Sequence, residues 1–401
     1  MKNLADKQKN DPRLRNIREK AENDPADKHR IEEDVLFHRD RLEENWKAML
    51  PECLEAPIIQ YVHTTLGHAG VDKCVWEINQ TFHLKNVGRK VRRLIASCDI
   101  CQRVKHPNRS LDIKERSHIP HKSGELCSID LYGPLPTGRG GVRYILVCFE
   151  VFSKYVKLYP IKAATTKSCL NKLVNHYFLK VVKPTVILSD NGTQFQSPLW
   201  KGTMQKHNVE VRYSAIRHPQ SNPSESCVRE ISKFCRIYCH SNHRKWAELI
   251  PHIENWLNNS FASATLYTPV ELLFEAEKNN MFQKYLPNLL KGETKHEEIQ
   301  EKIAKAYDRL KRRAHDRKNK RKHGNATWKP RVHDKALMRT EPSSDAIAGV
   351  IGKFIRPYEG PYMISKVIPP STVEVCDRNG KFKGQFNLKS IKVYKEANNM
   401  I

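Results

Sequence analysis

Alternating apolar and polar positions in the middle of the chain predict a sheet interleaved with helices. The run LCSIDLY (126–132) alternates as a half-buried strand does. Two further runs, 143–153 and 154–160, continue it as a meander with a glycine-rich first turn. Beyond them the periodicity switches between the two kinds of element, with helices predicted at 167–182 and 198–207 and strands at 184–190 and 209–214. This order predicts an α/β fold.

Helical periodicity dominates the next part of the chain. Asn222 as N-cap and Pro223 as first helical residue predict the start of a helix. In 246–275 tryptophan, leucine and isoleucine recur at helical spacing, followed by a turn at Thr268-Pro269, and we interpret this segment as core and scaffold. The segment 297–325 predicts a long helix that becomes strongly basic.

The two ends of the chain differ from this middle part. Residues 1–50 are rich in charge, and 30–41 fits either a short strand pair or a helix. A polar segment at 106–124 is typical of a linker. The last 70 or so residues contain short strands separated by turn signals, which fit a small SH3-like β-barrel: 335–340, 353–368, 371–377 and 381–394.

The net charge indicates a polyanionic partner. The chain of 401 residues has 70 Lys and Arg against 44 Asp and Glu, a formal charge of +26, so nucleic acid is the simplest candidate. No stretch approaches the ~18 apolar residues of a membrane span, and no signal peptide opens the chain. Most of the 11 cysteines lie in apolar or helical runs, which fits buried thiols in a reducing compartment.

Two histidines and two cysteines have the spacing of a structural zinc site. His63 and His68 are followed by Cys98 and Cys101 in a CxxC pair, which supplies four nitrogen and sulfur ligands. The alternatives are surface histidines with a chance CxxC pair, or a redox pair, although no thioredoxin-like strand precedes it. The nearest other ligands are Cys74 and His83, which we interpret as helix and core residues.

Three carboxylates occupy structural junctions that suit a metal-dependent active site. Asp130 lies in the first predicted strand, Asp190 ends the fourth, and Glu225 opens a helix. Oxygen ligands of this kind suit Mg²⁺ or Mn²⁺. The simpler interpretations are a capping-box glutamate at 225 and turn chemistry at Asp190, before Asn-Gly. Glu150, on the second strand, is the main rival acid, and we leave it out of the site.

The words around these residues resemble the integrases of retroviruses and long-terminal-repeat retrotransposons, and more narrowly the Gypsy-type branch. The resemblance rests on SDNGTQF, HPQSNPSE, DLYGPLP and RPYEGPYMI, at 189–195, 218–225, 130–136 and 356–364. It identifies the two histidines and two cysteines as the amino-terminal zinc domain. One departure is HDKALMR (333–339), because a Gly-Asp pair commonly begins this module and only Asp334 remains.

The resemblance implies a ribonuclease H-like core in which Asp130, Asp190 and Glu225 converge. These acids then bind two Mg²⁺ (or Mn²⁺) ions and catalyse 3'-end processing of element DNA and its strand transfer into target DNA. Double-stranded DNA is the implied partner, a homo-oligomer, often a tetramer on DNA, the implied assembly, and the nucleus the implied location. The segment 214–223 is expected to be a loop over the active site.

The resemblance also divides the chain into domains. They are an N-terminal extension that helps to bind DNA (1–50), a zinc-binding domain (51–105) and a linker (106–124). The catalytic core (125–285), a basic helical linker (286–325) and the SH3-like domain with its Gly-Pro-Tyr module (326–401) follow.

Two basic stretches are candidates for phosphate contact. The first follows Glu225 at helical spacing, with a solvated helix face as the alternative; the second is typical of nuclear import or nucleic-acid contact. Their residues are Arg229, Lys233 and Arg236, then Lys311, Arg312, Arg313, Arg317, Lys318, Lys320, Arg321 and Lys322.

Two other functions remain open on the sequence. A nuclease on the same fold cuts nucleic acid without joining it, although the zinc and barrel modules argue against this. A domesticated integrase acts as a chromosomal DNA-binding protein, although the intact acids argue against lost catalysis.

Overall fold

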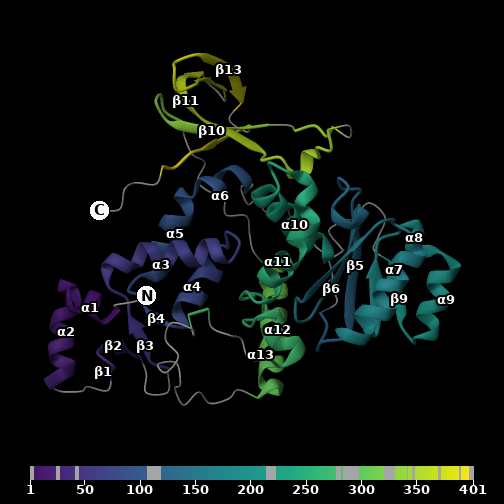
Figure 1. Ribbon diagram of the computed structural model, residues 1–401, viewed down its shortest axis with the longest axis horizontal. Coiled ribbons are helices and arrows are strands. Elements are labelled where there is room, and N and C mark those ends of the chain that lie inside the picture. Colours follow the sequence, from purple (N-terminus) through teal and green to yellow (C-terminus); the bar gives the residue numbers. More distant parts are fainter. Residues whose placement is uncertain are drawn as a thin grey trace.

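A computed structural model of the chain describes residues 4–23, 28–40, 45–105, 119–213, 223–276, 281–282, 298–319, 330–340, 342–345, 348–368, 372–387 and 390–396. The helical N-terminal part, the central sheet and a C-terminal sheet form three bodies, with a group of helices between the first two (Figure 1). Among the described helices, none is long and apolar enough to cross a membrane.

The central sheet has five strands in the order β7-β6-β5-β8-β9. Its first three strands form an antiparallel meander, and the last two run parallel to β5. The bounds are Leu126–Tyr132 for β5, Tyr144–Glu150 for β6, Val156–Ile161 for β7, Val186–Ser189 for β8 and Glu210–Tyr213 for β9. This is the predicted ribonuclease H-like α/β core, and each predicted strand is present.

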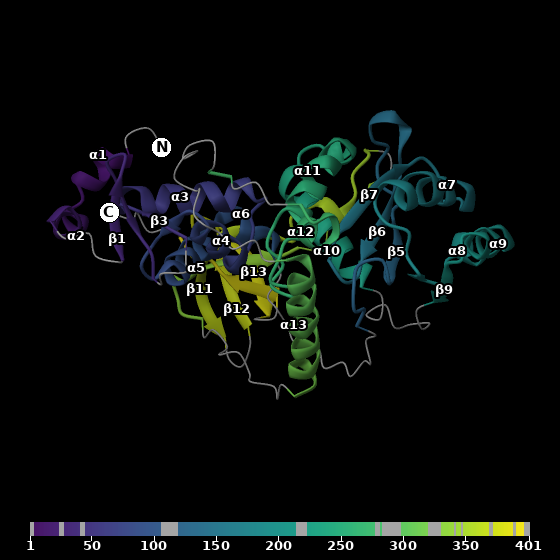
Figure 2. The ribbon, with the colours of Figure 1, turned by 90° about the horizontal axis from the view of Figure 1, so that it is seen from below.

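Helices cover both faces of this sheet, because its strands are apolar on both sides. One face packs against α7 (Thr166–Lys172), its π-helical continuation η2 (Leu173–Phe178) and α9 (Pro198–Lys206). The other face packs against α10 (Ser224–Tyr238) and α11 (Trp246–Asn258). Figure 2 shows the two groups on opposite sides of the strands.

Strand alternation assigns each side chain of β5 to one of these faces. Cys127 and Ile129 lie in the cluster with α7 and α9, whereas Leu126 and Tyr132 lie in the cluster with α10 and α11. Because the period of a strand is two residues, Asp130 belongs to the face that α10 covers.

The N-terminal part forms a second sheet with helices packed on it. Its strands are β1 (His29–Glu32), β2 (Val35–His38), β3 (Lys47–Met49) and β4 (Phe82–His83), in that order. The strand pair, not the helix, is therefore correct for 30–41. His83 lies in β4 and is partly exposed, so its interpretation as a helix and core residue was wrong.

The described residues of this N-terminal part form six helices, two before the sheet strands and four around the predicted zinc ligands. They are α1 (Leu4–Lys9), α2 (Pro12–Asn23), α3 (Glu52–Thr65), α4 (Val71–Asn79), α5 (Val87–Ser97) and α6 (Asp99–Val104). A shared core joins sheet and helices, since Phe37, Ile59, Val62, Ile78 and Phe82 form one buried cluster.

Two more helices lie farther along the described part of the chain. Thr268 does not make the predicted turn, since it caps α12 (Pro269–Phe274) in a capping box with Glu271. The predicted basic helix is α13 (Ile299–Asn319), and the rest of that segment, 320–325, lies outside the described residues. Phe152, Leu272 and Leu310 pack together, so α13 is attached to the core.

The C-terminal part is an antiparallel sheet in the order β13-β12-β11-β10-β14. The bounds are Lys335–Arg339 for β10, Tyr358–Ile368 for β11, Thr372–Cys376 for β12, Phe382–Asn387 for β13 and Ile391–Val393 for β14. Its first strand, β10, pairs with its last, β14, and β13 and β14 lie at the two edges of the sheet. In the turn before β10, His333 adopts a φ of 72°, which explains why glycine is common at this position.

Asp11 joins the extension to the zinc-binding region. Its carboxylate accepts the backbone N–H of Arg13 at 2.9 Å, in the first turn of α2, and that of Glu52 at 2.7 Å, at the start of α3. Burial alone raises the pKa of Asp11, but the Arg13 guanidinium and these two N–H groups lower it to about 2.

We expect Asp11→Ala to destabilise the chain by about 2 kcal/mol at neutral pH, since each lost helix cap costs about 1 kcal/mol. The pKa of Asp11 in the folded chain lies below its unfolded value of 3.8. The carboxylate therefore contributes to the free energy of unfolding above about pH 4, and this contribution is lost as the pH falls toward 2. Urea unfolding of the wild type and the variant near pH 7 and near pH 3 tests this. An equal difference in the free energy of unfolding between wild type and variant at both pH values contradicts this prediction.

Candidate zinc centre and candidate active site

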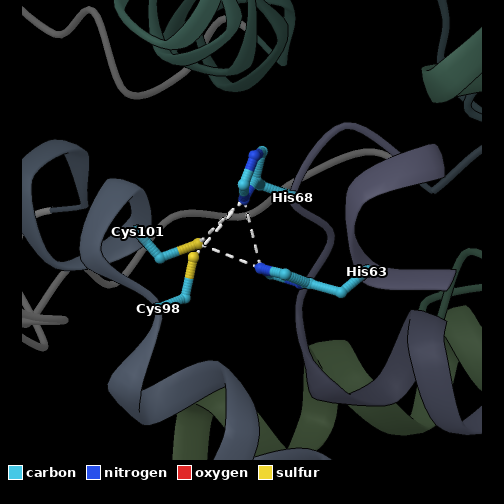
Figure 3. A group of neighbouring side chains, drawn as sticks. All are labelled: His63, His68, Cys98 and Cys101. Atoms are coloured by element: carbon cyan, nitrogen blue, oxygen red, sulfur yellow. Dashed lines mark hydrogen bonds between the residues drawn. The ribbon is translucent and has the colours of Figure 1, made fainter. Parts of the chain in front are cut away.

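The four predicted zinc ligands lie together (Figure 3). His63 is in the last turn of α3, and His68 is in the turn that follows. Cys98 lies between α5 and α6, and Cys101 lies inside α6. Their ligand atoms all lie within 4.8 Å of one another.

The distances fit a tetrahedron around one ion. His68 Nδ1 lies 3.2 Å from His63 Nε2, and Cys98 Sγ lies 3.5 Å from His68 Nδ1. Cys101 Sγ lies 3.5 Å from His63 Nε2 and 3.9 Å from His68 Nδ1. Tetrahedral zinc with ordinary Zn–N and Zn–S bonds separates its ligands by about 3.3–3.8 Å. The residues therefore fit Zn²⁺.

The surrounding backbone orients these ligands. The Nδ1 of His63 lies 2.9 Å from the Ala69 carbonyl oxygen, to which it donates, so Nε2 faces the other ligands. Gly67 precedes His68 in a left-handed turn, where a Cβ at Gly67 would lie 2.7 Å from Phe234. The turn therefore needs glycine both for its backbone and for this close contact with α10.

The pKa values of the two thiols shift in opposite directions. A hydrogen bond with Cys98, opposed by burial and assisted by His63 and His68, lowers the pKa of Cys101 well below its ordinary value. The same hydrogen bond and burial raise the pKa of Cys98. Zn²⁺ would bind both cysteines as thiolates, so its binding would release their protons.

The sheet pairs the strand that contains one predicted catalytic acid with the strand that precedes another. In the parallel pair, Ser128 of β5 lies opposite Leu188 of β8. Asp130 lies two residues further along β5, and Asp190 directly follows Ser189, the last residue of β8. Asp130 is partly buried, and Asp190 is exposed.

The start of α10 lies against the same part of β5. The Ser224 backbone N–H donates to Ser128 Oγ at 3.3 Å, and Tyr132 and Ser232 hydroxyls are 2.8 Å apart. Glu225 is therefore in the first turn of a helix fixed beside Asp130, although its side chain lies outside the described residues. The segment 214–222, the expected loop, also lies outside them.

Asp190 also makes the turn that its sequence predicts. Its Oδ1 accepts the Gly192 backbone N–H at 3.1 Å, and the short helix α8 (Thr193–Gln196) follows. One oxygen thus orients the carboxylate at the strand end, so the turn and a metal-binding role are compatible.

Glu150, the rival acid, has a structural environment. It is fully buried at the end of β6 and accepts the backbone N–H groups of Phe152 at 3.2 Å and Ser153 at 2.6 Å. Burial raises the pKa of Glu150 despite these bonds. Its carboxylate therefore organises the β6–β7 turn.

Some of the predicted DNA-contacting residues have partners within the chain, and others are exposed. Lys233 forms an ion pair with Glu230, and the Arg236 Nε donates to the Lys353 carbonyl at 2.9 Å. The Arg313 guanidinium donates to Ser263 Oγ at 3.0 Å. Exposed positions are Arg229, Lys311 and Arg312. The side chains of Arg317, Lys318, Lys320, Arg321 and Lys322 lie outside the described residues.

Two family models match the chain. Residues 50–107 match the integrase zinc binding domain, and residues 120–219 match the integrase core domain.

Relatives with similar sequences are polyproteins. The Pro-Pol polyprotein of feline foamy virus is 27% identical over 240 residues, which are 60% of this chain and 20% of that protein. The Transposon Tf2-3 polyprotein of Schizosaccharomyces pombe is 27% identical over 223 residues, 52% of this chain and 16% of that protein. The chain thus spans a fifth or less of the length of these two relatives.

Solved structures with a similar chain include the simian T-cell lymphotropic virus intasome in complex with PP2A regulatory subunit B56 gamma. It is 11% identical with a TM-score of 0.35, over 86% of this chain and 100% of that one. The HTLV-2 integrase catalytic core domain in complex with magnesium is 16% identical with a TM-score of 0.32. The match covers 39% of this chain and 99% of that one.

The class of the protein follows from the fold and the two domain matches. The chain combines a region that matches the integrase zinc binding domain, in which the structure assembles two histidines and two cysteines, with a region that matches the integrase core domain.

We expect Cys98→Ser to lower the zinc content by about one equivalent per chain and to lower the melting temperature, since a structural zinc site contributes folding free energy. Metal analysis and thermal unfolding measure both effects. Cys53→Ser, which changes an exposed cysteine of α3, is the matched control and should leave both unchanged. Unaltered zinc content in Cys98→Ser would refute the four-ligand assignment.

Proposed function

We propose that this chain is a Gypsy-type retrotransposon integrase, which trims the 3' ends of element DNA and joins them to target DNA. The observation that carries the proposal is the parallel pairing of β5, which contains Asp130, with β8, which Asp190 follows, beside the start of α10. The integrase core match covers both aspartates.

Asp130, Asp190 and Glu225 are the proposed ligands of two Mg²⁺ or Mn²⁺ ions. Their oxygen atoms suit hard dications, and Asp130 lies in β5 while Asp190 follows β8, the parallel neighbour of β5. The ions, when bound, acidify the attacking hydroxyl and stabilise the leaving 3'-oxygen. The carboxylates position these charges at the scissile phosphate, and the β5 register sets the spacing between the two aspartates.

One site can perform both reactions because each exchanges one phosphodiester bond for another P–O bond. In end processing, water attacks the phosphate, and the bond to the 3'-oxygen of the retained strand breaks. In strand transfer, the exposed 3'-hydroxyl attacks a target phosphate, and the target's own 3'-oxygen leaves. Neither step needs a covalent protein intermediate or a nucleotide cofactor.

The charge of the chain supports double-stranded DNA as the substrate. A formal charge of +26 favours phosphate contacts, which give strong salt dependence and little sequence specificity. Exposed Arg229 on α10 and exposed Lys311 and Arg312 on α13 are the described candidates for such contacts. Action on chromosomal DNA places the protein in the nucleus, and concerted joining of two ends favours a homo-oligomer, with a tetramer on DNA as the proposed form.

Two observations support the Gypsy-type branch within the integrases. The sequence RPYEGPYMI (356–364) overlaps β11 of the C-terminal sheet, as expected of a Gly-Pro-Tyr module. The Schizosaccharomyces pombe transposon is among the relatives, at 27% identity. Foamy virus proteins have the same identity, so the assignment rests mainly on the motif.

We expect Asp130→Asn, Asp190→Asn and Glu225→Gln each to lower strand transfer by at least about a hundred-fold, because each removes an anionic metal ligand. Joining of short duplexes that carry element ends, with Mg²⁺ present, measures this. Glu210→Gln, which changes an exposed acid of the same sheet, is the matched control.

The same assay separates the competing functions. A wild-type chain that cuts without joining is a nuclease, and one that binds without cutting is a DNA-binding protein. Full joining by any of the three acid variants refutes their catalytic assignment.

We expect the double variant Lys311→Ala, Arg312→Ala to weaken binding to any duplex sequence and to reduce the slope of log K against log salt by about 2, one per lost phosphate contact. Binding titrations at several salt concentrations measure the slope. An unchanged slope would exclude these two residues from the DNA contact.

A further inference from the structure

A second group of metal-ligating side chains lies in the N-terminal sheet, separate from the zinc centre. One ligand atom from each of His38, Asp40 and His83 lies within 4.8 Å of the other two. His38 ends β2 and His83 ends β4, so two strands with β3 between them supply the group.

The strand registers explain why these side chains meet. Phe37 lies opposite Ala48, which lies opposite Phe82, and all three are buried in one core. Because alternate residues of a strand point to opposite faces, His38 and His83 belong to the other face of the sheet. There the two rings approach each other, with centroids 4.0 Å apart.

The hydrogen bonds of His38 resemble those of a metal ligand held by a neighbour. Its Nδ1 lies 3.0 Å from His29 Nε2, which fixes the plane of the ring. Its Nε2 lies 3.0 Å from Asp40 Oδ1, about the separation of two ligands on one ion. Ligating histidines usually have their second nitrogen hydrogen-bonded in this way.

We propose that His38, Asp40 and His83 bind a divalent transition-metal ion such as Zn²⁺, with His29 as the residue that orients His38. Two imidazoles and one carboxylate suit Zn²⁺ better than Mg²⁺, which prefers oxygen ligands. The Asp40 side chain is 61% exposed, so solvent can supply a fourth ligand, unlike at the closed His-His-Cys-Cys centre.

Such an ion cross-links two parts of the chain that are far apart in sequence. His38 and Asp40 precede the zinc-binding helices, whereas His83 lies between α4 and α5. The ion therefore fastens the N-terminal extension to the zinc-binding region. This role is independent of DNA joining and does not rest on the proposed function.

The test is a zinc titration of the full chain after chelation, followed by removal of free metal and elemental analysis. We expect two equivalents per wild-type chain and one in His83→Gln, with a lower melting temperature. Cys98→Ser should also retain one equivalent, and the double variant should retain none. His240→Gln, which changes an exposed histidine, is the matched control and should retain two.

Asp40→Asn guards against a variant that merely unfolds, because Asp40 is mostly exposed. It should weaken binding at the second site by about 10- to 100-fold and leave the first unchanged. With Co²⁺ in place of Zn²⁺, thiolate-to-cobalt absorption reports the cysteine site alone, so this band should persist in His83→Gln. One equivalent in the wild type, or two in His83→Gln, overturns the proposal.

Discussion

The parallel pairing of β5 with β8 is the constraint on which the candidate active site depends. Ile129 and Ile187 are fully buried against α7 and α9, and this packing sets the register of the two strands. A slip of one residue would turn every side chain of a strand to the opposite face. Leu188, two residues before Asp190, would then move from the face that packs against α10 to the side of Trp200 and Met204. Packing on one face of the sheet thus positions the chemistry on the other.

Helix α10 links this site to the zinc centre. One part of it is bonded to β5 through Ser224 and Ser128, while Phe234 lies against the turn of the zinc ligands at Gly67. Glu230 adds an electrostatic contact: burial and Lys233 lower the pKa of Lys73, on α4, to about 8, and Glu230 opposes that change. A metal ion that orders the turn at His68 therefore also supports the helix that carries Glu225.

Features with strong local patterns could be predicted from the sequence. Apolar alternation predicts β5 with its observed bounds, and the spacing of His63, His68 and CxxC predicts the ligand set that the structure assembles. The capping box at Thr268 was missed even though Thr-Pro-Val-Glu contains its signal. Strand β4 has two residues and a parallel partner distant in sequence, so no local period announces it. The place of His83 beside His38 needed the fold.

The C-terminal sheet is joined to the zinc centre through the end of α6. The Lys392 ammonium donates to the carbonyls of Gln102 and Lys105, both at 2.9 Å, where the last carbonyls of a short helix lack partners within it. A cation at this end also interacts favourably with the helix dipole. Two thiolates and Zn²⁺ together have no net charge, so a zinc-loaded site would do little to stabilise the positive charge of Lys392. The carbonyls at the end of α6 stabilise this charge instead, and this contact ties the C-terminal sheet to the helix that carries Cys101.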